Sequence, residues 1–101
     1  MSLPEILEAI ETLLDRVCAK AGVERSDLSA VGIGLPGFVD CAEGKVFWSS
    51  ILAERNVPIA AAATGRLGLP VYVDNDANLV ALAELWFGAG RSLSDFAVVT
   101  I

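Results

Sequence analysis

Histidine is absent from the 101-residue sequence, and cysteine occurs only at Cys18 and Cys41. Without an imidazole, the chain lacks the side chain that most often serves as a general acid or base near neutral pH and a common zinc ligand. The two cysteines are far apart and form no Cys-x-x-Cys pair, so we expect both to be reduced, as in a cytoplasmic protein. We therefore predict no metal site within this chain.

Basic residues are also scarce: seven Lys and Arg stand against 13 Asp and Glu, giving a net charge of −6. They are scattered, whereas contacts with phosphates need clustered positive charge, so we predict that this segment does not bind nucleic acid. No apolar run approaches the roughly 20 residues of a membrane-spanning helix, and the start of the chain does not have the pattern of a signal peptide. We therefore expect no contact with a membrane.

Apolar residues, in contrast, are abundant. They make up 54% of the chain, and the mean hydropathy is +0.60. Soluble domains usually contain about 45–50% apolar residues. Either the core is unusually large or part of the apolar surface meets something other than solvent, and we favour the second interpretation.

The first twenty residues have a helical pattern. Ser2 and Glu5 have the spacing of a capping box, and Gly22 is a typical residue after a helix end. Between them, apolar residues recur three and four positions apart, which predicts a helix over residues 3–20 with one buried face. That face comprises Ile6, Leu7, Ile10, Leu13, Leu14 and Val17.

Strand and helix patterns alternate along the rest of the chain, which predicts an α/β fold with a mostly parallel sheet. Short apolar runs predict strands, whereas alanine- and leucine-rich segments predict helices. The predicted strands cover residues 30–35, 45–48, 69–73 and 96–101, and the predicted helices cover residues 59–67 and 75–87.

Polar residues are most concentrated at residues 74–78, Asp-Asn-Asp-Ala-Asn, between a predicted strand and a predicted helix. Ligands of open α/β sheets bind at the carboxyl ends of strands, and the first turn of a helix favours negative charge. Asp76 and Asn75 together could accept from and donate to neighbouring sugar hydroxyls. Asp and Asn are also the preferred residues for capping a helix, so a structural role alone stays open.

Residues 32–37, Gly-Ile-Gly-Leu-Pro-Gly, form a second candidate for backbone contact with a ligand. A dinucleotide fingerprint would need a helix after the glycines, but Pro36 and a strand-like segment follow, so a tight turn is the alternative. Ser49 and Ser50 could bind a sugar or be ordinary loop residues. Trp48 could stack on a sugar ring, although we expect it, like Trp86 and Phe87, to pack in the core.

Together these segments resemble the ROK family of sugar kinases and sugar-responsive repressors, over about two thirds of the chain, from residue 31 to residue 101. The motifs follow one another in the family's order, which makes the set far more specific than any one of them. The local sequence of residues 86–101 is similar to that of xylose-repressor-like members of the family. The matching segments are residues 32–40, 44–46, 66–73, 74–78, 81–84 and 87–91.

The resemblance implies a lobe of the actin-like, hexokinase-like (ribonuclease H-like) fold, with a small sugar bound in the cleft between two lobes. Residues 1–94 would belong to the N-terminal lobe, and residues 95–101 would be the truncated first strand of the C-terminal lobe. In the family's kinases Asp76 would be the general base that removes the sugar hydroxyl proton. Asn75, Gly37 and Ser50 would contact the sugar.

Several parts of the family pattern are not found in these 101 residues. The Asp-x-Gly-x-Thr phosphate loop, the second glycine-rich phosphate loop and the Cys/His zinc site are absent, so we expect no cofactor and no phosphoryl transfer by this fragment alone. A parent kinase would use ATP and magnesium. A parent regulator would bind DNA through a helix-turn-helix outside this chain, and this is the reading we favour.

An assembly also follows from the missing parts. Without the family's first strands, the sheet would expose an edge and an apolar face, and such edges pair with other chains. We therefore expect a homodimer or a larger assembly.

Overall fold

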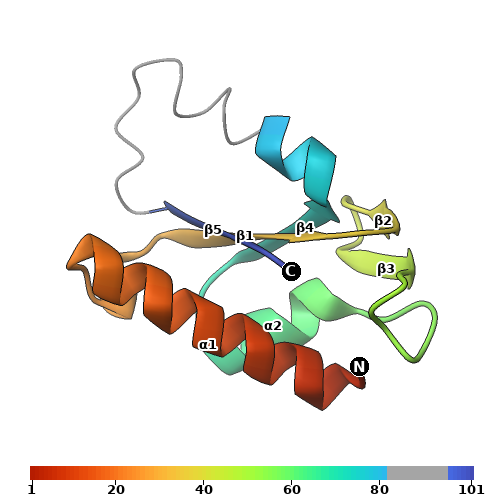
Figure 1. Ribbon diagram of the computed structural model, residues 1–101, viewed down its shortest axis with the longest axis horizontal. Helices are drawn as coiled ribbons and strands as arrows, with labels where there is room; N and C mark the ends of the chain where they lie inside the picture. Colours follow the sequence, from red (N-terminus) through yellow and green to blue (C-terminus); the bar gives the residue numbers. More distant parts are fainter. Residues whose placement is uncertain (82–95) are drawn as a thin grey trace.

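The computed structural model describes residues 1–81 and 96–101, which form an α/β fold (Figure 1). The first helix, α1 (Leu3–Ala21), precedes a short 3-10 turn, η1 (Arg25–Asp27). Then come β1 (Ala30–Leu35), β2 (Phe38–Asp40), β3 (Lys45–Trp48) and α2 (Ile59–Leu67). After β4 (Val71–Asn75), a helix begins at residue 76 and is described to residue 81, and β5 (Phe96–Thr100) ends the described part.

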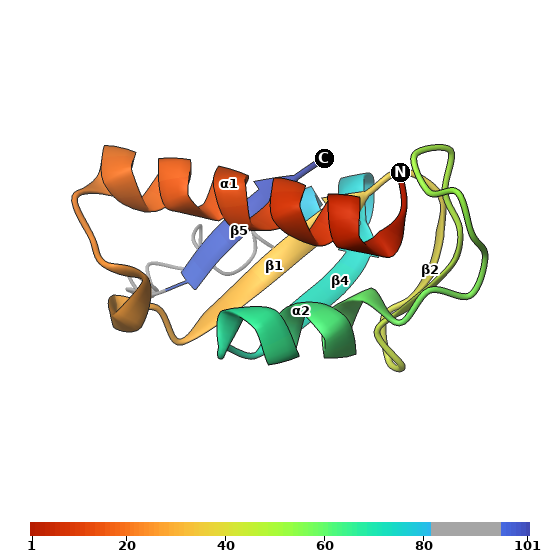
Figure 2. The same ribbon diagram turned by 90° about the horizontal axis from the view of Figure 1, so that it is seen from below.

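The main sheet contains three parallel strands in the order β4–β1–β5, which confirms the predicted parallel sheet. β2 and β3 form a separate antiparallel pair beside it. Both α1 and α2 lie on one face of the main sheet, whereas the helix that begins at residue 76 lies on the other (Figures 1 and 2). The fold thus has three layers, with β1 at the centre of the middle layer.

The core lies between the main sheet and the two helices α1 and α2. β1 turns Val31, Ile33 and Leu35 toward these helices, and all three are fully buried. Ile6, Ile10 and Leu14 of α1 cover them, as the periodicity predicted. Val17, which was predicted on the same buried face, is instead 39% exposed. Burying such side chains contributes on the order of 1.5–3 kcal/mol each, so this layer supplies most of the stability of the described part.

Most predicted element boundaries are confirmed. α1 begins with the Ser2–Glu5 capping box and ends at Gly22 in the left-handed conformation, at φ 70°. β1, β3 and α2 have the predicted bounds. β4 was predicted over residues 69–73 but covers Val71–Asn75, because its pairing with β1 runs from Val71, opposite Val31, to Asn75, opposite Leu35.

The prediction that Trp48 packs in the core is wrong, because its side chain is 44% exposed. The β2–β3 pair is a separate small sheet that turns Val46 inward and leaves its aromatic side chains outside. Trp86 and Phe87, also predicted to be core residues, lie outside the described residues. Across the described ranges, no helix is long and apolar enough to cross a membrane.

Candidate functional site

The three parallel strands end together at one edge of the main sheet. Gly34 of β1 is in register with Asp74 of β4 and with Thr100 of β5. Beyond this level the chain turns away at Pro36 and Gly37, while β4 runs directly into the next helix. The edge therefore collects the polar segment 74–78, the glycine-rich turn and the end of β5, at the position where open α/β sheets bind ligands.

Gly34 allows these segments to approach closely. A Cβ atom on Gly34 would lie 3.2 Å from the Cα of Asp76 and 3.2 Å from the Cγ2 of Thr100. It would also lie 3.1 Å from Leu79, whose buried side chain packs the helix onto this part of β1. The absence of a side chain at Gly34 thus brings the start of the helix, and Asp76 with it, down onto the sheet.

Asn75 performs the capping role that its residue type suggested. Its side-chain oxygen accepts a hydrogen bond from the backbone N–H of Asn78 at 2.9 Å. The Asp74 carboxylate in turn accepts from the backbone N–H of Asn75 at 2.7 Å and from the side-chain amide of Asn78 at 3.5 Å. Asp74 and Asn78 therefore hold the strand end and the first turn together.

Asp76 is not needed for that cap. Its side chain is partly buried, and one carboxylate oxygen, Oδ1, accepts from the backbone N–H of Ala77 at 2.9 Å. Among residues 1–81 and 96–101, the structure gives the other oxygen, Oδ2, no hydrogen-bond partner. Because the first turn of a helix favours negative charge, a carboxylate here is well placed to accept a hydroxyl proton in a hydrogen bond.

Gly37 lies against the loop that carries the two predicted serines. Its φ of 126° is strained for other residues, and a Cβ there would clash with the backbone carbonyl of Trp48 and lie 2.9 Å from the Cα of Ser49. Ser49 is buried and its Oγ accepts from the backbone N–H of Ile51 at 3.4 Å, whereas Ser50 is exposed. The structure thus joins the glycine turn to the serine loop and leaves the Ser50 side chain available.

Thr100 is a residue of this edge that the sequence reasoning did not identify. It is exposed at the end of β5, and its methyl group lies beside Gly34, as does the backbone of Asp76. Its position depends on the pairing of β5 with β1. The local sequence does not determine which strands pair, so the pattern of residues 96–101 alone could not have identified Thr100.

No three His, Cys, Asp or Glu side chains among the described residues gather closely enough to hold a metal ion. Both cysteines are free, Cys18 buried in α1 and Cys41 exposed in the turn between β2 and β3. The side chains at the strand ends carry carboxylate, amide and hydroxyl groups, which can form hydrogen bonds with a polyhydroxylated ligand.

Comparison with protein families gives a match to the ROK family model over residues 2–101. The chain belongs to the ROK family. The ROK relatives include both repressors and kinases. A putative xylose repressor from Caldicellulosiruptor sp. (strain Rt8B.4) is 35% identical over 96% of the chain, which corresponds to 24% of that protein.

Two kinases illustrate the other branch of the ROK family. A glucokinase from Halalkalibacterium halodurans is 34% identical over 91% of the chain and 28% of its own length. An N-acetyl-D-glucosamine kinase from Erwinia tasmaniensis is 40% identical over 81% of the chain and 26% of its own length. The chain thus spans about a quarter of the length of these curated relatives. No solved structure was found to match it.

Proposed function

We propose that this chain is part of the sugar-sensing domain of a ROK transcriptional regulator, with a ROK sugar kinase as the second candidate. The observation that supports a sugar site is that two residues of segment 74–78 have different hydrogen-bond roles. Asn75 caps the helix, while Asp76 keeps a carboxylate oxygen without a partner among the described residues. A helix cap needs only one such residue, so the additional carboxylate at the strand ends supports ligand binding.

The regulator reading is supported by similarity to xylose repressors over nearly the whole chain. In such a protein, the sugar changes DNA affinity by binding one of two conformations more tightly. We propose that DNA is bound by a helix-turn-helix elsewhere in a cytoplasmic homodimer. The net charge of −6 supports a segment that binds the sugar and leaves DNA to another part.

The kinase reading is supported by the glucokinase and N-acetyl-D-glucosamine kinase relatives. Here Asp76 would be the general base, and the complete protein would use ATP and magnesium to phosphorylate a sugar hydroxyl. In both readings we propose that residues 1–94 belong to the N-terminal lobe of an actin-like, hexokinase-like fold. Residues 95–101 would then begin the second lobe, and Gly37 and Ser50 would join Asn75 and Asp76 around the sugar.

Calorimetric titration of the full-length protein tests the sugar site. The panel is xylose, glucose and N-acetylglucosamine, and we expect one of them to bind. Asp76→Asn should weaken this binding about ten- to hundredfold, because hydrogen bonds to charged groups contribute roughly 1.5–3 kcal/mol. Glu8→Gln, an exposed change on α1, is the matched control and should leave the affinity unchanged. Absence of binding by every sugar of the panel would contradict the proposal.

Two further measurements on the same protein separate the candidates. For a regulator, the sugar should change the affinity for operator DNA, and ATP with the sugar should give no sugar phosphate. For a kinase, sugar phosphate should form, and Asp76→Asn should slow its formation by about 10²–10⁴-fold, the usual contribution of a general base.

A further inference from the structure

The β2–β3 pair carries an exposed aromatic surface, defined here as Phe38, Phe47, Trp48, Arg55 and Asn56, which together line one shallow depression. The aromatic side chains are 70%, 47% and 44% exposed for Phe38, Phe47 and Trp48. Large apolar side chains exposed together on a soluble protein commonly mark a binding surface.

The aromatic surface is fixed by backbone pairing. Phe38 of β2 is opposite Trp48 of β3, and their ring centroids lie 6.3 Å apart with planes inclined at 48°. On the other side of β3, the backbone N–H of Asn56 donates to the carbonyl of Phe47 at 3.1 Å. Because the strands set these positions, a ligand would meet a surface that is already formed and would lose little affinity to ordering it.

The chemistry of the aromatic surface suits a sugar ring. A sugar has faces of C–H groups that pack on aromatic rings, and an edge of hydroxyl groups that form hydrogen bonds. The Arg55 guanidinium offers several N–H donors, and the Asn56 amide both donates and accepts. Small-molecule sites typically combine apolar walls with a few such polar groups.

The aromatic surface is connected along the chain to the turn and the loop at the Asp76 edge. Phe38 follows Gly37 directly, and Trp48 immediately precedes Ser49. Gly37 packs on the backbone of Trp48 and Ser49, and β2 contacts β4. A ligand longer than one ring could therefore extend from the ends of the parallel strands to the β2–β3 pair.

We infer that the aromatic surface is a second sugar-ring subsite, so that the ligand is an oligosaccharide with one ring at Asp76 and the next ring on Trp48. This inference rests on the sugar site proposed above. Stacking on one aromatic ring contributes roughly 0.5–1.5 kcal/mol, so the second ring should improve affinity about two- to tenfold.

The test compares monosaccharides with disaccharides on the full-length protein by calorimetry. The pairs are xylose with xylobiose, glucose with cellobiose and with maltose, and N-acetylglucosamine with chitobiose. We expect one disaccharide to bind about two- to tenfold more tightly than its monosaccharide, in line with the stacking contribution. Trp48→Ala should remove this gain and leave monosaccharide affinity unchanged, whereas Trp48→Phe should keep part of it.

Tyr72→Ala is the matched control, since Tyr72 is an aromatic residue of β4 that is 56% exposed and lies outside the aromatic surface. It should preserve the preference for the disaccharide. Equal affinity for every pair, or an equal loss for both ligands in Trp48→Ala, would overturn the second subsite while leaving Asp76-dependent monosaccharide binding intact. Failure of every sugar to bind would overturn the proposed function as well, so the two failures are distinguishable.

Discussion

Replacing Gly37 directly tests the close packing between the turn after β1 and the loop that contains Ser49 and Ser50. Its φ of 126° is rarely adopted by residues with a side chain, and a Cβ would meet the backbone of Trp48 and Ser49. We predict that Gly37→Ala lowers the free energy of unfolding by at least 1–3 kcal/mol, roughly the cost of holding a strained backbone conformation. Urea denaturation measures the change.

Gly65 provides the opposite control at the same scale. It lies within α2, and a Cβ there would contact nothing within 4 Å. Gly65→Ala should therefore stabilise the protein by about 0.5–1 kcal/mol, the usual preference for alanine over glycine inside a helix. A Gly37→Ala variant as stable as the wild type would show that the turn can move away from Trp48.

At the residue scale, the sequence identified Asp76 and Asn75 because both lie in one short segment after an apolar strand. It could not tell which of them caps the helix, since either residue type can do so. The cap depends on which side-chain oxygen reaches the N–H of Asn78, and in the structure this is the oxygen of Asn75. Thr100 was missed because it reaches this edge only through strand pairing.

At the element scale, the hydrogen bonds that cap the N-terminus of α1 should stabilise the fold to a degree that depends on pH. The Glu5 carboxylate accepts from the backbone N–H of Ser2 at 3.2 Å, and the Ser2 hydroxyl accepts from the N–H of Glu5 at 3.4 Å. The backbone hydrogen bond from Ser2 is the main cause that holds the pKa of Glu5 below its usual 4.5. Since the pKa is lower in the folded state, ionised Glu5 stabilises the fold above that value.

We therefore predict that Glu5→Gln reduces the melting temperature at neutral pH, and that this difference shrinks as the pH falls below 4.5 through the folded-state pKa. Glutamine keeps an acceptor oxygen, so the comparison isolates the charge. Thermal denaturation followed by circular dichroism measures it, with Glu8→Gln as the exposed control on α1. A difference between wild type and Glu5→Gln that does not vary with pH would contradict the prediction.

The same scale shows where local sequence was informative. Helix α1 was predicted almost completely because its cap, apolar stripe and terminal glycine are all local signals. The exposure of Trp48 was not predicted. A short strand with an aromatic residue has the same local sequence pattern whether it lies inside the main sheet or in a small separate sheet. η1 was not predicted either, because a segment of three residues is too short to show helical periodicity.

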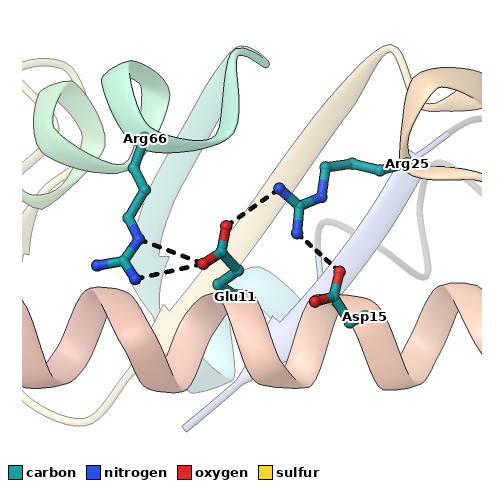
Figure 3. Close-up of polar contacts among 4 residues, drawn as sticks. All are labelled: Glu11, Asp15, Arg25 and Arg66. Atoms are coloured by element: carbon teal, nitrogen blue, oxygen red, sulfur yellow. Dashed lines mark hydrogen bonds and ion pairs between the residues drawn. The ribbon is translucent and has the colours of Figure 1, made fainter.

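At the scale of the whole molecule, four charged side chains connect α1 to η1 and to α2 (Figure 3). Glu11 of α1 pairs with Arg25 of η1 at 3.1 Å and with Arg66 of α2 at 3.3 Å. Asp15 pairs with Arg25 at 2.7 Å, and this hydrogen bond is the main cause that raises the pKa of Arg25. Sequence could not predict this network, because Glu11 and Arg66 are 55 positions apart.

Glu11 is the centre of the network, and its removal should be felt more than that of an isolated surface charge. Exposed ion pairs contribute about 0.2–1 kcal/mol each, so Glu11→Gln, which weakens two pairs, should destabilise the protein by about 0.5–1.5 kcal/mol. The loss should fall in 1 M NaCl, where the screening length is only about 3 Å. Urea denaturation at low and high salt measures both effects.

Two comparisons make the network prediction specific. Asp15→Asn, which removes one pair from a side chain that is 61% exposed, should cost less than Glu11→Gln. Glu54→Gln should cost nothing, since Glu54 is exposed and forms no ion pair within the described residues. If all three variants lost the same stability, the effect would reflect net charge alone. The graded order instead follows from geometry, because Glu11, unlike Asp15 and Glu54, pairs with two arginines from different described segments and so connects α1 to both η1 and α2.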